Sequence, residues 1–330
     1  MLAINVSSAA VDGLRDAVSV PACVYALAAT GLNLQFGFAG LMNFGHVASA
    51  MVGAYGTGIA VHEGLPLWLG ILIGIASGAL LGFALGLPTL RLRADYLAIV
   101  TISTAEILRV VINSARLQDI TGGPIGITGI AKSFYAINPL ADGRYGFGSW
   151  SFNQNTLWTM IVGWTLVALA SLLVYRITRS PWGRMLKAIR EDEEAARSLG
   201  KNVFGAKLQS LVLGSTIGAL AGVIFVFDGG FVKPEFYVSQ VTFNWYLVVI
   251  LGGIGTVFGP ALGSVVYWFA ISVFNSLLTQ AIGNRSFWFI DGTDTGAIRF
   301  VVVGLAVILL LVFRPQGILG DRQEALVRDR

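Results

Sequence analysis

The sequence predicts an all-α polytopic membrane protein with about nine transmembrane helices. Of its 330 residues 55% are hydrophobic and 12% charged, which is about half of the roughly 25% charged residues of a soluble domain. The mean hydropathy is +0.74. Apolar stretches of about 17 to 25 residues, long enough to cross hydrocarbon, recur along the chain, and backbone groups in hydrocarbon favour helices because each must be paired within its segment. We therefore interpret residues 1–330 as one transmembrane domain.

The N-terminal stretch before the first span lacks the basic start and long apolar run of a cleavable signal peptide. The first span is therefore expected to act as the targeting signal. The short "GFAGLMNFG" between the first two spans is a possible re-entrant break. The predicted spans are 18–36, 40–61, 66–89, 95–113, 156–176, 204–227, 241–258, 260–279 and 296–313.

The third predicted span carries a glycine at every fourth position. This small-xxx-small spacing places the glycines on one helix face and lets neighbouring backbones approach closely in lipid. The pattern predicts a structural ridge and not a ligand site. The residues are Gly70, Gly74, Gly78, Gly82 and Gly86.

The distribution of Lys and Arg predicts the orientation. The connections on one side hold fourteen Lys and Arg residues and those on the other side hold seven; the richer side should be cytoplasmic. The N-terminus is then outside, the tail 314–330 is cytoplasmic, and 114–155 is an external loop. Its Gly, Pro, Asn and aromatic content fits an ordered external cap, either a docking face or a plain connector.

The 179–203 segment, on the predicted cytoplasmic side, concentrates ten of the forty charged residues. Pro181 suits a first helical turn, and "WGRMLKAIR" fits a short amphipathic helix. "EDEE" then places carboxylates at the start of a second helix, which Gly200 would end. We interpret the segment as a docking site that a soluble partner grips by charge pairing and by burying Leu199 and Ile189. The alternative is a solvated charged loop.

Several kinds of chemistry are not indicated. "LGGIGTVFG" (251–259) lacks the Lys-Ser/Thr ending of a phosphate loop. The two histidines, His46 and His62, are far apart and Cys23 is the single cysteine, so no metal site is expected. The net charge of +4 is not gathered in one patch, so no nucleic-acid partner is expected. We expect no catalysis and no bound cofactor; ATP use would require another subunit.

The charged series "GRMLKAIREDEEAARSLGKNV" resembles the cytoplasmic coupling region of branched-chain amino-acid ABC transporter permeases. "GLNLQFGFAGLMNFGHVASAMVGAY", "RLRADYLAIVTISTAEILRVVIN", "TGGPIGI", "LGGIGTVFGPALG" and "FRPQGILG" resemble further stretches of that family, in the same order. Each glycine motif is weak alone, but the ordered set is specific and covers nearly the whole chain.

The resemblance implies a permease subunit of a binding-protein-dependent importer for branched-chain or other neutral amino acids, with a type II-like fold and inverted repeats. It implies a second, usually nonidentical permease, two cytoplasmic ATPase subunits that bind ATP and Mg, and an extracytoplasmic binding protein, all at a bacterial cytoplasmic (inner) membrane. The coupling residues would be Arg184, Lys187, Arg190, Glu191, Asp192, Glu193, Glu194, Ala196, Arg197, Leu199 and Gly200, and the external motif Thr121, Gly122, Gly123, Pro124 and Gly126.

Polar residues within the spans are costly in lipid and are candidates for function. Glu106 and Arg109 are three residues apart and share a helix face, so they are expected to pair, either to hold helices together or to receive the charged ends of a zwitterion. Residues that line the path or form interhelical hydrogen bonds would be Asn33, Asn43, His46 and Asn244.

Two other functions remain open from the sequence. A urea or short-chain amide permease of the same family would share the helical pattern. An ion-coupled secondary amino-acid carrier would place carboxylates or broken helices at the midplane and would not need the 179–203 segment.

Overall fold

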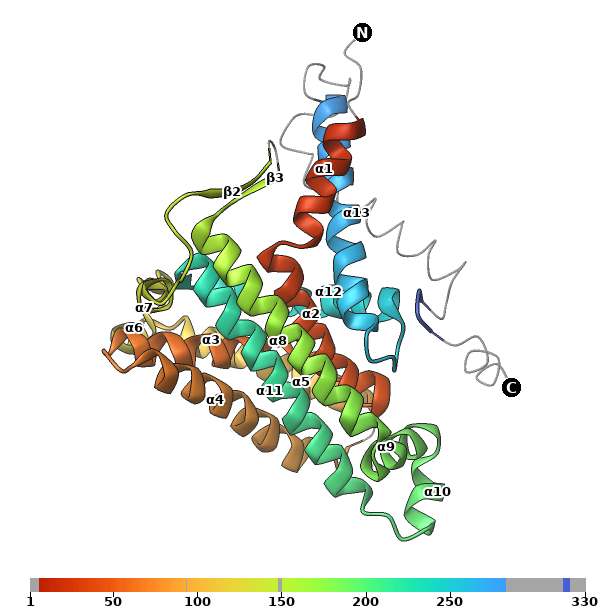
Figure 1. Ribbon diagram of the computed structural model, residues 1–330. Helices are drawn as coiled ribbons and strands as arrows, with labels where there is room; N and C mark the ends of the chain where they lie inside the picture. The colour runs from red at the N-terminus through yellow and green to blue at the C-terminus, as the bar shows by residue number, and fades with distance from the viewer. Residues whose placement is uncertain (1–5, 93, 148–149, 283–316, 321–330) are drawn as a thin grey trace.

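The computed structural model describes residues 6–92, 94–147, 150–282 and 317–320, and these form a bundle of long helices with short elements at its ends (Figure 1). The helices are α1 (Val6–Ala17), α2 (Val20–Asn33), α3 (Val47–His62), α4 (Leu67–Thr89), α5 (Ala94–Ile112), α6 (Gln118–Thr121), α7 (Lys132–Ala136), α8 (Gln154–Arg179), α9 (Pro181–Glu191), α10 (Glu193–Ser198), α11 (Val203–Gly229), α12 (Ser239–Gly252) and α13 (Gly259–Ile282). A π-helix η1 (Leu34–Phe38) continues α2, and η2 (Ala115–Leu117) and η3 (Pro234–Tyr237) are short 3₁₀ helices. The strands are β1 (Ile127–Thr128), β2 (Arg144–Phe147), β3 (Trp150–Asn153) and β4 (Phe231–Val232).

Eight of the predicted spans overlap helices α2, α3, α4, α5, α8, α11, α12 and α13; the ninth, 296–313, lies outside the described residues. Among the described helices, α4, α8, α11 and Gly259–Leu277 of α13 are long and apolar enough to cross a membrane. Two bent pairs, α1 with α2–η1 and α5 with η2–α6, would raise this number to six. The figure of nine spans stays a prediction, since α3 has 16 residues and α12 has 14.

Helix α1 was not expected from the sequence. Its polar residues hide it from a search for apolar runs, but Asp12 and Asp16 accept hydrogen bonds from α13. Ser272 donates to Asp16 at 2.7 Å, and Ser276 donates to Asp12 at 3.1 Å. An amphipathic helix paired to a neighbour in this way needs no continuous apolar stretch.

The glycine ridge of α4 is confirmed as a packing surface. All five glycines are buried, and α4 lies along α11 and α3. A Cβ at Gly74 would lie 2.6 Å from the carbonyl oxygen of Gly53 on α3. A Cβ at Gly78 would lie 3.0 Å from the carbonyl oxygen of Ser215 on α11. The helices therefore meet backbone to backbone at these positions.

Helix α11 is at the centre of the bundle, between α2, α3, α4 and α8 (Figure 1). In the most apolar 18-residue stretch of α11, 72% is buried, against 33% in the corresponding stretch of α4. The large exposed side chains of α4, such as Leu72 and Leu80, lie on its outer face. The centre of the protein is therefore formed by α2, α3 and α11, and α4 lies at the periphery.

The described residues also include two small antiparallel sheets, which join short segments outside the long helices. Strands β2 and β3 form a hairpin, and β1 pairs with β4 through Ile127 opposite Val232. The second pairing fastens the 114–155 loop to the end of α11. Tyr135 strengthens this connection by donating to the Phe227 carbonyl oxygen at 2.5 Å. The described part of the 114–155 loop is therefore attached to the helix bundle, and its role as a docking face stays a prediction.

Candidate functional site

The 179–203 segment forms two short helices joined at a sharp corner (Figure 1). Ser180 caps α9 by accepting from the Gly183 N–H at 3.3 Å, and Pro181 occupies the first turn. Asp192 caps α10 by accepting from the Ala195 N–H at 3.0 Å. Gly200 has φ +73°, the left-handed conformation that ends a helix. The predicted pair of helices is confirmed.

One face of this helical pair belongs to the core of the protein. Leu186 is fully buried, and Ile189 and Ala196 are 3% and 4% exposed; all three pack in a cluster with Val203 and Leu211 of α11. The expectation that a partner buries Ile189 is therefore wrong, because α11 and the neighbouring turns already cover it.

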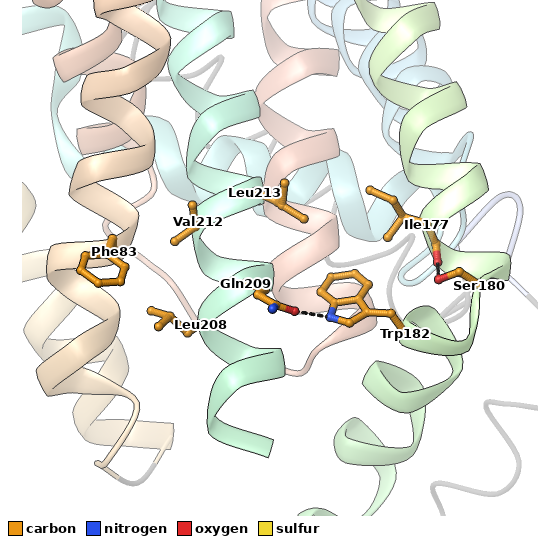
Figure 2. Close-up of a pocket in the computed structure, with 8 residues that line it drawn as sticks. All are labelled: Phe83, Ile177, Ser180, Trp182, Leu208, Gln209, Val212 and Leu213. Carbon is orange, nitrogen blue, oxygen red and sulfur yellow. Dashed lines mark hydrogen bonds between the residues drawn. The ribbon is translucent and has the colours of Figure 1, made fainter. Parts of the chain in front are cut away.

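A groove lies where α9 meets α4, α8 and α11, and Figure 2 shows its lining. Its volume is about 530 Å³. The indole N–H of Trp182 on α9 donates to Gln209 of α11 at 2.6 Å (Figure 2). This bond is a second attachment of α9 to the bundle. The groove is lined by Phe83, Ile177, Ser180, Trp182, Leu208, Gln209, Val212 and Leu213.

The opposite face of the segment is exposed and charged. Arg197 pairs with Glu193 at 2.9 Å and with Glu194 at 3.4 Å, and Glu193 also pairs with Lys207 of α11. Leu199 is 78% exposed, a large apolar side chain left open to solvent. Of the predicted coupling residues, those exposed are Arg184, Lys187, Glu191, Asp192, Glu194, Arg197, Leu199 and Gly200.

Arg190 points away from this exposed face and connects α9 to the membrane helices. Its guanidinium donates to the carbonyl oxygen of Gly37 in η1. A Cβ at Gly255, in the loop between α12 and α13, would lie 2.8 Å from Arg190 Nη1. The same guanidinium thus meets the end of α2–η1 and the α12–α13 connection. Lys187, one turn earlier, lies 5.9 Å from the ring centroid of Phe38.

Asn33 joins the end of α2 to the α12–α13 loop. It is 1% exposed, its amide donates to the Thr256 carbonyl oxygen at 2.8 Å, and its carbonyl accepts from the Gly255 N–H at 2.9 Å. Both functional groups of the amide are used by the α12–α13 loop. Asn33 therefore holds this loop against the end of α2.

The chain between η1 and α3 is not helical, as the predicted break required. Asn43 donates to Gln35 at 3.0 Å and accepts from the Gly45 N–H at 3.1 Å. Gln35 in turn donates to the Leu211 carbonyl oxygen of α11 at 3.0 Å. Irregular backbone inside a helix bundle needs such partners, since no water is available to supply them. Asn43 thus supports the break directly.

His46 shows that the chain turns back along α2 before α3 begins. Its Nε2 lies 3.2 Å from the carbonyl oxygen of Ala28, ten residues before the end of η1. Its ring packs edge-on against Trp245 at 5.7 Å. Asn33, Asn43 and His46 are all buried and contact neighbouring segments; a role in lining the path stays a prediction for them.

The remaining predicted intramembrane residues lie further out. Glu106 and Arg109 form the expected pair at 2.5 Å, and the Glu106 side chain is 46% exposed on α5. Asn244 is half-buried on α12. Among the described residues, no hydrogen bond or ion pair joins Glu106, Arg109 or Asn244 to Asn43.

The external motif forms a tight turn. Thr121 donates to the Ile112 carbonyl oxygen at 2.8 Å, and Gly122, Gly123 and Gly126 have φ of +73°, +53° and +78°. Side chains at these three positions would be strained. The turn presents Pro124 and Ile125 to solvent, and Ile125 is 68% exposed.

The structure describes no group of three or more His, Cys, Asp and Glu side chains that could hold a metal ion within the ranges given above.

Residues 15–312, most of the chain, match the family model described as "Branched-chain amino acid transport system / permease component". The chain belongs to this permease family.

Relatives of this permease in bacteria and archaea cover most of its length. It is 31% identical over 307 residues to the high-affinity branched-chain amino acid transport system permease protein LivM of Escherichia coli (strain K12), which is 90% of this chain and 68% of the relative. It is 26% identical to the probable LivM of Methanocaldococcus jannaschii, over 91% of each chain. It is also 24% identical to the LivH permease protein of Escherichia coli (strain K12), over 90% of this chain and 91% of the relative.

Several contacts in this permease were not expected from the sequence. Gln35 lies within an apolar stretch, yet its amide connects Asn43, in the non-helical segment before α3, to the Leu211 carbonyl oxygen of α11. Trp182 has a polar partner in Gln209 that is 27 positions away. In the sequence, Ile125 is not distinguished from other apolar loop residues. In the structure, the turn formed by Gly122, Gly123 and Gly126 leaves it exposed.

Proposed function

We propose that this chain is the transmembrane permease subunit of an ABC importer for branched-chain or other neutral amino acids. The observation that carries the proposal is the match of residues 15–312 to the permease family, together with the relatives described as branched-chain amino acid transport permeases. The chain forms the path, and partner subunits supply the energy.

The exposed face of the 179–203 segment is the proposed contact with two cytoplasmic ATPase subunits, which would hold ATP and Mg. The support is its shape: a capped helical pair with a buried face on α11 and an exposed face carrying Leu199 and unburied charges. A rigid element of this kind transmits displacement, whereas a flexible loop absorbs it.

Arg190 and Asn33 give the displacement a route into the membrane helices. A shift of α9 moves Arg190, which bonds the end of α2–η1 and lies against the α12–α13 loop. Asn33 couples the same loop to α2. We propose that these contacts turn ATP-driven movement of α9 into a change in the path between outward and inward openings.

A second, nonidentical permease would complete the path. The support is that this chain resembles two different permease proteins of one organism, LivM and LivH of Escherichia coli. An extracytoplasmic binding protein would dock on the 114–155 loop, where Pro124 and Ile125 are exposed. In this arrangement the chain spans a bacterial inner membrane, with its N-terminus outside and its C-terminus in the cytoplasm.

The test is reconstitution of the chain with its partner permease, ATPases and binding protein in proteoliposomes. Uptake of radiolabelled L-leucine should require both ATP and the binding protein, and ATP hydrolysis should rise when the loaded binding protein is added. Leucine uptake that persists without the ATPase subunits would indicate a secondary carrier. Uptake of urea without uptake of leucine would contradict the substrate class.

A further inference from the structure

Helix α11 (Val203–Gly229) reaches from one end of the bundle to the other. Its 27 residues extend about 40 Å at 1.5 Å per residue, which exceeds the roughly 30 Å of a membrane's hydrocarbon core. Figure 1 shows α7 of the 114–155 loop near one end of α11, and α9 and α10 near the other end. The same helix therefore contacts the predicted external loop and the 179–203 segment.

The 114–155 loop is attached to the outer end of α11 by side chains and by backbone. Phe134 of α7 stacks on Phe227 of α11, with ring centroids 4.5 Å apart and an interplanar angle of 8°. The Tyr135 hydroxyl donates to the Phe227 carbonyl oxygen at 2.5 Å. Strand β1 pairs with β4, which directly follows α11, and the Ile130 N–H donates to the Gly230 carbonyl oxygen at 3.2 Å. We call these contacts the outer attachment.

The inner end of α11 is attached to the 179–203 segment by three different interactions. Gln209 accepts from the Trp182 indole N–H at 2.6 Å, and Lys207 forms an ion pair with Glu193 of α10. Leu211 packs in the buried cluster that also contains the apolar face of α9. A displacement of the inner end of α11 therefore moves α9 and α10 with it.

Between these two attachments α11 is continuous and closely packed. It contains no proline, a common cause of sharp kinks in helices. A Cβ at Gly222 would overlap the carbonyl oxygen of Ala50 on α3, and one at Gly214 would lie 2.5 Å from the Gly31 carbonyl oxygen on α2. Close-packed interiors transmit strain instead of absorbing it, so we expect α2, α3 and α11 to move as one body.

We propose that α11 transmits the docking of the binding protein on the 114–155 loop to the 179–203 segment, and that Tyr135 positions the loop on α11 for this step. The proposal rests on the proposed function, which supplies the two partners, and adds the element that connects them. A shift of the loop displaces the outer end of α11, and its inner end displaces α9 and α10 against the ATPase subunits. Weakening the outer attachment should then lower the coupling between the two partners.

Helix α8 is a second connection between the two regions, because it follows β3 and leads directly into α9. It is less enclosed by the bundle: 39% of its most apolar 18-residue stretch is buried, against 72% for α11. A less enclosed helix bends more easily without moving its neighbours. We therefore favour α11 as the transmitting element, and the experiments below separate it from α8.

The first experiment measures ATP hydrolysis by the complete transporter in proteoliposomes, with and without saturating leucine-loaded binding protein. Tyr135→Phe keeps the ring and removes the hydroxyl. The stimulated rate should fall at least twofold, to about a third of wild type, the effect of one neutral hydrogen bond. The basal rate and the concentration of binding protein that gives half-maximal stimulation should stay within twofold. Assembly with the partner subunits, checked by size-exclusion chromatography, shows that the variant folds.

Tyr145→Phe is the matched control. The Tyr145 hydroxyl donates to the Ala141 carbonyl oxygen at 2.8 Å, so this bond lies within the same loop and does not involve α11. Tyr145 is also on β2, the partner of the strand that leads into α8. Its substitution should change the stimulated rate by less than twofold.

A second experiment restores the outer attachment covalently, because the Tyr135 hydroxyl also interacts with Thr159 of α8. Thr128 and Phe231 are opposite each other in the β1–β4 pairing, where Cα atoms are about 4.5–5.5 Å apart, a separation that a disulfide spans. Thr128→Cys and Phe231→Cys are added to Tyr135→Phe. Oxidation should restore stimulation at least twofold and reduction should remove it again, with wild type treated in parallel. Since this disulfide joins the loop to α11 and not to α8, restoration assigns the effect to α11.

A stimulated rate in Tyr135→Phe that falls by less than twofold would overturn the proposal, and so would an equal loss in Tyr145→Phe. A basal rate that falls by the same factor as the stimulated rate would assign the effect to general packing and would also overturn it. Failure of the disulfide to restore stimulation would exclude α11 as the transmitting element. Wild-type transporter whose ATP hydrolysis does not rise with loaded binding protein would instead overturn the proposed function.

Discussion

Replacing Arg190 by Met should uncouple ATP hydrolysis from import without unfolding the protein. The substitution keeps an apolar stem of similar length and removes the bond to the Gly37 carbonyl oxygen. A hydrogen bond from a charged donor contributes about 1.5–3 kcal/mol when buried. Arg190 is only half-buried, so solvent screening reduces this contribution to about 1–2 kcal/mol, a factor of roughly 5 to 30 in an equilibrium.

The assay is the number of leucine molecules imported per ATP hydrolysed, measured in proteoliposomes that contain the complete transporter. We expect this ratio to fall about fivefold or more in Arg190→Met while ATP hydrolysis continues. Arg176→Met is the matched control, since Arg176 is an exposed residue of α8 outside the 179–203 segment. An unchanged ratio in Arg190→Met would refute the proposed route through α9 and η1.

Three further predictions follow from the packing and hydrogen bonds. Gly78→Ala should destabilise the protein by about 1–3 kcal/mol through overpacking, seen as a lower melting temperature in detergent, while Gly143→Ala, with open space around it, should not. Asn33→Ala should leave two groups of the α12–α13 loop unpaired and cost about 1–3 kcal/mol in thermal unfolding; an unchanged melting temperature would contradict its structural role. Glu106→Gln should lower stability by less than about 1 kcal/mol, because its pair with Arg109 is partly exposed, and should leave leucine uptake within twofold; a large loss of uptake would assign the pair to the path.

The sequence predicted most of the long helices because membrane length and apolar composition are local properties. It also predicted the glycine ridge of α4 and the capped helices of the 179–203 segment, since spacing, Pro181 and Gly200 carry those signals within a few residues. Helix α1 escaped prediction because its stability depends on α13, more than 240 positions later.

The candidate sites were predicted less completely, for the same reason. Asn33 and Asn43 were recognised as polar residues in apolar surroundings, but their partners lie in a distant loop and in Gln35. Ile189 was predicted to face a partner because the amphipathic pattern shows that one face is apolar but not what covers it. A cavity between α2, α3, α11, η3, α12 and α13 gives no signal in the sequence, because its walls come from six separate elements.

The most direct test of the central claim is cross-linking from Leu199. The single native cysteine, Cys23, is buried, so Leu199→Cys adds a thiol on an exposed position that a short bifunctional reagent can join to the ATPase subunits. We predict a cross-link to an ATPase subunit in inside-out membrane vesicles, with a yield that changes on adding ATP. A thiol at this position that reacts with an impermeant reagent from outside intact cells, and never with an ATPase, would contradict the account.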